Sequence, residues 1–90
     1  MLLLVEQVEQ VSAEALVCVV RCLAGRVALG DTFDAVAVNG GKNVVVNPRV
    51  IELHRHEGVP VEFIDPPHSA KALMTGTGVG AVVSGARLCG

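Results

Sequence analysis

The sequence contains no Trp, no Tyr and only two Phe among its 90 residues. The core therefore has to be built from aliphatic side chains, and hydrophobic residues make up 51% of the chain. β-Branched and aliphatic residues suit a narrow closed barrel better than a wide cavity. Charged residues are also scarce, at 18%, which excludes a disordered acidic or basic tail. We expect a single globular domain over residues 1–90, because a chain of this length has room for one core only.

Long hydrophobic runs are missing as well. The opening apolar run meets an acid at Glu6, and it is too short for a signal peptide or a membrane span. The net charge of −2 provides no overall positive field to attract a phosphate backbone. These features predict a cytoplasmic protein that does not contact membranes.

Cysteine is limited to Cys18, Cys22 and Cys89, an odd number without any CxxC spacing. This excludes both a disulfide framework and a zinc knuckle as expectations. Cys18 and Cys22 project to the same face of an expected strand, and we interpret them as small core residues. The opposite face carries Arg21, whose guanidinium has to reach water. Cys89 is expected near the surface.

Short Val-rich runs recur between Gly, Asn and Pro, and no segment has the apolar spacing of an amphipathic helix. This pattern is typical of an antiparallel sheet. The expected strands lie at 2–8, 14–23, 32–38, 43–53, 59–64, 70–75 and 86–89. The NGGKN segment at 39–43 predicts a tight hairpin, and the two prolines at 66–67 predict a rigid corner. Pro48 predicts a strand that begins after it or carries a bulge.

The segment GRVALGDTF at 25–33 follows the second expected strand. Its Gly30 and Asp31 are suited to a turn in which Gly adopts an unusual φ and Asp bonds to the backbone that follows it. Leu29 and Phe33 are then expected to re-enter the core. The segment predicts a structural turn between two core strands.

The same segment carries a resemblance to a known family. The order of a long strand, GRVALGDTF, and a strand that leads into VIELHRHEGVPVEFIDPPHSAKALMTGTG resembles the second domain of translational GTPases such as elongation factor Tu. The matching positions are Gly25, Leu29, Gly30, Asp31, Phe33, Glu57, Gly58, Val59, Val61, Ala70, Leu73, Gly76, Ala86, Arg87 and Leu88. The resemblance implies an all-β fold, a small closed six-stranded Greek-key barrel.

What such a barrel does in these factors is to dock on ribosomal RNA, aminoacyl-tRNA ends or neighbouring domains. The resemblance therefore implies a stand-alone, non-enzymatic binding module. The GGKN segment at 40–43 lacks the earlier Gly and the hydroxyl residue of a phosphate-binding loop, so no nucleotide and no other cofactor is expected. A nucleophile elbow and a paired acidic dyad are also missing from the sequence.

Groups that can carry positive charge concentrate between positions 49 and 71. They are Arg49, His54, Arg55, His56, His68 and Lys71. If the fold brings them together, they form a candidate contact for ribosomal RNA with a steep salt dependence. The alternative is a protein partner, met through an exposed strand edge or the Gly-rich tail, and the lack of stacking aromatic residues favours it.

Two further alternatives stay open at this point. His54 and His56 lie two apart on one face of an expected strand, and they could chelate a metal if His68, Glu57 or Asp65 supplied a third ligand. The simpler interpretation of the HRHEG segment is a polar strand end in solvent. A homodimer is also plausible if Val19 or Leu23 is exposed.

Overall fold

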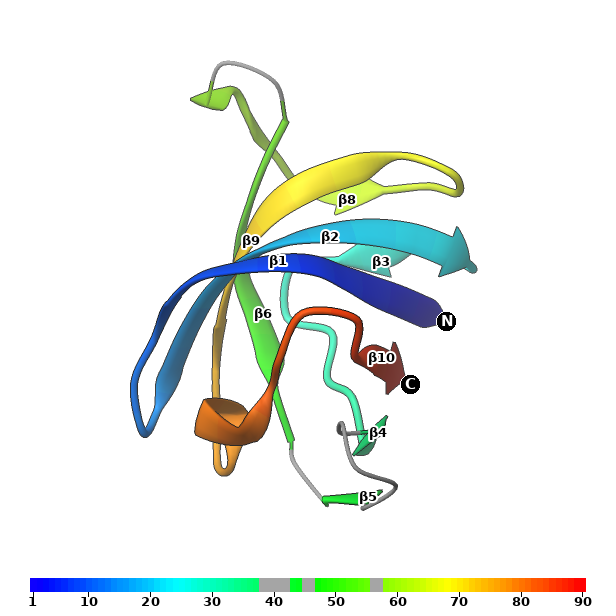
Figure 1. The fold of residues 1–90 in the computed structure, drawn as a ribbon. Helices are drawn as coiled ribbons and strands as arrows, with labels where there is room; N and C mark the ends of the chain where they lie inside the picture. Colours follow the sequence, from blue (N-terminus) through cyan, green and yellow to red (C-terminus); the bar gives the residue numbers. More distant parts are fainter. Residues whose placement is uncertain (38–42, 45–46, 56–57) are drawn as a thin grey trace.

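In the computed structural model, residues 1–37, 43–44, 47–55 and 58–90 are described. They form antiparallel strands and one short 3₁₀ helix (Figure 1). The elements are β1 (Leu2–Val11), β2 (Ala15–Ala24), β3 (Val27–Ala28), β4 (Ala35–Ala37), β5 (Asn43–Val44), β6 (Arg49–His54), β7 (Pro60–Val61), β8 (Phe63–Ile64), β9 (Ser69–Thr75), η2 (Val79–Ala81) and β10 (Arg87–Cys89). The all-β prediction is confirmed. Within the described residues, no helix has the length and apolar character needed to cross a membrane.

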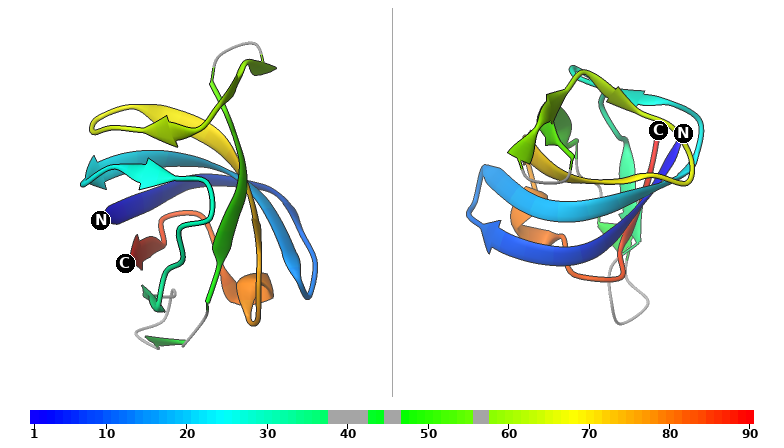
Figure 2. Two further views of the ribbon diagram at one scale, coloured as in Figure 1. Left: turned by 180° about the vertical axis from the view of Figure 1, so that it is seen from behind. Right: turned by 90° about the horizontal axis from the view of Figure 1, so that it is seen from above.

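The strands form one large sheet and one small sheet. The large sheet has the order β5-β4-β10-β1-β2-β9-β6-β7, and the small sheet pairs β3 with β8. The large sheet is strongly curled, so that its strands surround a common interior when seen from above (Figure 2). The sheets do not close into a barrel, because β5 and β7 at the ends of the large sheet are not paired with each other. The strand expected from Thr32 onwards begins only at β4, and before it Thr32 makes one isolated bridge to Arg49.

Strand β1 carries two β-bulges against β2, one after Val5 and one after Val8. The extra residues are Glu6 and Glu9, and both are exposed. The sequence VEQVEQV places its Val residues three apart, whereas a regular strand alternates with a period of two. One additional residue in each repeat therefore keeps Val5 and Val8 towards the core and both carboxylates towards solvent.

Strand β2 provides the predicted buried face. That face consists of Leu16, Cys18, Val20 and Cys22, all with no exposed surface. Arg21 on the other face is exposed, as predicted. Val19 and Leu23, which were expected to be exposed, are half-buried.

The central strands begin and end within a few residues of the predicted limits, but the later ones are divided. The expected strand 43–53 is split into β5 and β6 on either side of Pro48, as the missing proline N–H requires. The expected strand 59–64 is split into β7 and β8, which pair with different partners. Strands β4 and β5 pair antiparallel across the predicted hairpin, whose residues 39–42 lie outside the described ones. The corner at 66–67 closes with a bond from His68 N–H to the Asp65 carbonyl.

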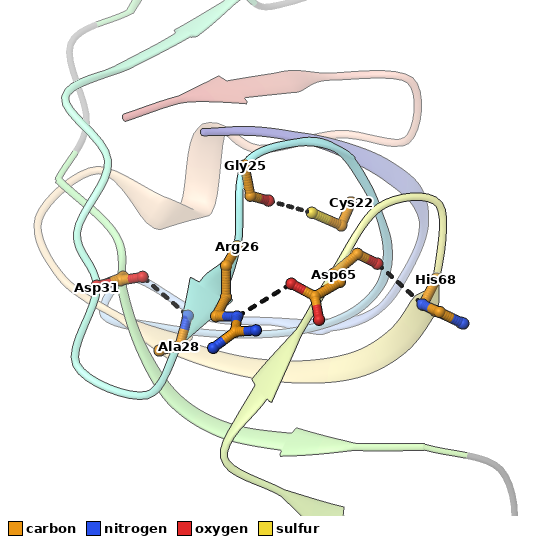
Figure 3. Close-up of polar contacts among 7 residues, drawn as sticks. All are labelled: Cys22, Gly25, Arg26, Ala28, Asp31, Asp65 and His68. Carbon is orange, nitrogen blue, oxygen red and sulfur yellow. Dashed lines mark hydrogen bonds and ion pairs between the residues drawn. The ribbon is translucent and has the colours of Figure 1, made fainter.

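The GRVALGDTF segment contains the short strand β3, so it is not only the turn that was predicted, and it differs from the prediction in two further details. Gly30 has a φ of 88° and Phe33 is fully buried, as expected. The Asp31 carboxylate, however, accepts the N–H of Ala28 at 2.8 Å, so it bonds to the preceding backbone and not to the following one (Figure 3). Leu29 is 43% exposed and was wrongly assigned to the core. Its N–H donates to the carbonyl of Glu62, which holds the turn outside the interior.

Candidate functional site

The cationic residues predicted as a site are distributed over two ends of strand β6. Arg49 is the first residue of β6 and pairs with Thr75, while His54 is the last and pairs with Lys71. The two ends are about 17 Å apart at the usual rise of an extended chain. Arg49 is therefore separated from the other predicted residues.

A groove of about 490 Å³ opens at the His54 end of β6. Among the described residues it is lined by His54, Arg55, Gly58 and Lys71, and we call it the His54 groove. Nδ1 of His54 lies 3.3 Å from the carbonyl oxygen of Gly58, which holds the ring at the groove wall. Three of the six predicted residues are thus brought together.

His68 is not among the described residues that line this groove. His68 follows the proline corner, where its Nδ1 lies 3.1 Å from the Asp65 carbonyl (Figure 3). The carbonyl of His68 accepts the N–H of Cys22. His56 and Glu57 lie outside the described residues. Among the residues that are described, no three His, Cys, Asp or Glu side chains gather closely enough to hold a metal ion.

Several basic side chains have a carboxylate partner on the surface. Nζ of Lys71 lies 2.7 Å from Glu9, which belongs to β1, so the lysine chain reaches across β2 and leads its ammonium group away from the His54 groove. Arg21 lies 3.7 Å from Glu6, and the same carboxylate accepts the hydroxyl of Ser69 at 2.9 Å. Both carboxylates come from the bulges of β1. These pairs reduce the positive field that an RNA backbone would meet.

A second surface, which the sequence did not predict as a site, lies around Arg26. The Arg26 guanidinium lies 4.1 Å above the centre of the Phe63 ring, and its Nε donates to Asp65 at 3.0 Å (Figure 3). Two exposed apolar residues belong to segments that are hydrogen-bonded near this pair: the N–H of Leu29 donates to the carbonyl of Glu62, the residue before Phe63, and the N–H of Gly30 donates to the carbonyl of Val50, the residue before Ile51.

Four side chains define what we call the Arg26 surface: Arg26, Leu29, Ile51 and Phe63. Its three apolar members are each 42–44% exposed. The alternation of Phe63 with the buried Ile64 was a sequence signal for this surface, since neighbours in a strand face opposite sides. The position of Leu29 had no such signal.

The buried thiols are chemically quiet. Burial, with a smaller contribution from Glu9, raises the pKa of Cys18 to about 12. Burial, followed by the charge of Asp65, also raises the pKa of Cys22 above its ordinary 9.0. Its Sγ donates to the carbonyl of Gly25 at 2.8 Å (Figure 3). Neither thiol is suited to act as a nucleophile, since the reactive form is the thiolate.

A further hollow of about 590 Å³ lies where the β1–β2 turn meets the end of β9. Its described lining is Ala13, Glu14, Ala15, Thr75, Gly76, Thr77 and Gly78. The lining contains one carboxylate and otherwise small or hydroxyl side chains, so it lacks the paired groups that acid-base chemistry requires.

No protein-family model, curated protein or solved structure matches this chain. The function has to be argued from its own surfaces.

Proposed function

We propose that this chain is a non-enzymatic binding module that docks a protein partner through the Arg26 surface. The observation that carries the proposal is the arginine stacked on an exposed aromatic ring, with the exposed Leu29 and Ile51 on segments hydrogen-bonded nearby. Arg and aromatic residues are the types that contribute most at protein interfaces, where they are surrounded by apolar contacts. Phe63 and Asp65 each contact the same guanidinium, so the arginine is already oriented before a partner arrives.

The kinship with the second domain of translational GTPases is part of the same proposal. It is supported by the GRVALGDTF turn and by the backbone bonds of residues 29–34. These residues donate to Val50 and Pro48 on one side, and to Cys89 on the other. Such bonds on both sides are what a closed six-stranded Greek-key barrel would need at its seam. In this view the partner is a protein of the translation machinery.

Direct docking on ribosomal RNA is less well supported. Lys71, Arg21 and Arg26 each lie next to a carboxylate, and the whole chain has a net charge of −2. Arg49 lies at the far end of β6 from the His54 groove. Among these described residues, several consecutive phosphates would not meet a continuous line of basic side chains that lack a neighbouring carboxylate.

The test compares two serine variants by cosedimentation with ribosomes and by affinity purification from the cells that make the protein. Phe63→Ser removes the ring from the Arg26 surface, while Val11→Ser removes an equally exposed apolar residue at the end of β1. We expect the wild type and Val11→Ser to retain the same partner at high salt, and Phe63→Ser to lose it by about tenfold or more in affinity.

Circular dichroism of all three proteins checks that the fold is kept. Equal retention of the partner by Phe63→Ser would contradict the proposal. Retention that disappears after ribonuclease treatment, or that falls steeply with salt, would favour RNA instead.

A further inference from the structure

We infer that the His54 groove is a binding site for a single phosphate monoester, and that Glu9 competes with this ligand for Lys71. The site is distinct from the Arg26 surface and does not rest on the proposed protein docking. It follows from the lining of the groove and from the position of one lysine.

The groove has the right donors for a dianionic phosphate. Arg55 offers a planar fork of N–H groups that matches two phosphate oxygens, and His54 lies beside it in the wall. Lys71 pairs with His54 across the β6–β9 ladder, so its stem lies next to the same wall. The volume of about 490 Å³ is larger than a phosphate group needs and leaves room for the molecule that carries it.

Lys71 has two alternative partners on opposite sides of its strand. Its Nζ lies 2.7 Å from Glu9 on β1, whereas the groove lies on the side of β6. The flexible four-carbon stem can turn the ammonium group from one side to the other without moving the backbone. Both side chains of the pair are partly exposed, at 51% and 30%, and pairs of this kind hold together weakly. A phosphate in the groove can therefore displace Glu9 from Lys71.

A single phosphate fits the surroundings better than a nucleic-acid backbone. Lys71 and Arg55 stand at one end of β6, and Arg49 stands about 17 Å away at the other end. The neighbouring Arg21 lies close to Glu6. Several phosphates in a row would meet these carboxylates, while one phosphate meets only the groove.

The experiment titrates the protein with O-phosphoserine and with uridine monophosphate, followed by the amide resonances of Arg55, Gly58 and Lys71. Both ligands contain a phosphate monoester, which is attached to an amino acid in the first and to a nucleoside in the second. We expect both to shift the groove amides with dissociation constants in the roughly millimolar range. Lys71→Met should weaken binding by about tenfold, and Arg49→Gln, the matched control, should leave it unchanged. Binding of only one of the two ligands still supports a monoester site and identifies its carrier.

The competition is tested by Glu9→Gln, which keeps the size of the side chain and removes its charge. It should tighten phosphate binding by up to about fivefold, because Lys71 is no longer held on β1. Unchanged or weaker binding in Glu9→Gln would overturn the competition, and unmoved groove amides with both ligands would overturn the site. A uridine oligonucleotide that binds far more tightly than the monophosphate, with a steep salt dependence, would replace the single-phosphate site by a backbone track.

Discussion

Gly76 is a residue at which the fold leaves no room for a side chain. Its φ of 146° is a conformation that residues with a Cβ rarely adopt. A Cβ at this position would also press against the backbone carbonyl of Asn47, whose N–H donates to Thr77. Gly85 also has a positive φ, of 90°, but open space surrounds the position of its missing Cβ. Substitution of Gly85 would therefore introduce backbone strain alone, whereas substitution of Gly76 would introduce both strain and a steric contact.

We predict that Gly76→Ala destabilises the protein far more than Gly85→Ala. Gly85→Ala should cost about 1–2 kcal/mol through strain alone. Gly76→Ala should cost about 2 kcal/mol more, because the contact is with backbone that cannot turn aside. Urea unfolding followed by circular dichroism measures both. Equal midpoints for the two variants would contradict a steric contact between Asn47 and a side chain at position 76.

The thiols of Cys18 and Cys89 should differ sharply in reactivity. Cys18 is fully buried with a pKa near 12, while Cys89 is exposed. At mildly alkaline pH we expect a disulfide reagent to modify Cys89 in the native protein, and Cys18 only after urea is added. A Cys89→Ser variant should therefore be nearly unreactive until it unfolds. Rapid native labelling of that variant would contradict the prediction.

The raised pKa of Cys18 also sets a pH window for stability. In the unfolded chain this thiol ionises near 9, whereas in the folded protein it stays protonated up to about 12. Between these values the unfolded state binds fewer protons than the native state. A rise in pH therefore favours the unfolded state. We expect the free energy of unfolding to fall by roughly 1.4 kcal/mol per pH unit from this group, and Cys18→Ala to remove that slope. An identical alkaline slope in the variant would refute it.

At the scale of elements, the two sheets should differ in how readily they open. Strand β2 is paired with β1 up to Ala24 and with β9 from Ala15 to Arg21, while β3 and β8 pair through two residues each. Two-stranded sheets have little stability of their own. We expect the amides of β2 and β9 to exchange hydrogen only through global unfolding, and those of β3 and β8 to exchange by local opening. Equal protection of both sheets in native-state exchange would indicate one cooperative unit, as in a closed barrel.

The sequence predicted best those strands in which apolar and polar residues alternate, because the alternation itself indicates which side chains are buried. The four buried residues of β2 and the exposed Arg21 follow from a period of two. The short pairing of β3 with β8, and the bond from the N–H of Leu29 to Glu62, depend on residues 62–64, which lie far along the chain. No local pattern encodes such partners, so this part of the fold could not be predicted.

At the scale of the whole molecule, the chain is compact. Its Cα radius of gyration is 11.5 Å, close to the roughly 12 Å usual for 90 residues. Compactness brings His54, Arg55 and Lys71 together through the β6–β9 pairing, as the sequence allowed. It also brings the carboxylates of β1 next to basic side chains. The order of charged residues along the sequence does not predict these contacts. The sequence therefore grouped His54, Arg55 and Lys71, but the ion pair between Lys71 and Glu9 could not be predicted from it.

The two bulges of β1 have a consequence for how this strand can change in length. Each bulge holds one residue, Glu6 or Glu9, that has no pairing partner on β2. Removing Glu9 would make the flanking pairs, Val8 with Cys18 and Gln10 with Val17, directly consecutive. A deletion at this site therefore shortens the chain without turning the interior face outward, whereas a deletion within the regular ladder of β2 and β9 would do so. Glu9 is thus a natural site of single-residue length variation in β1.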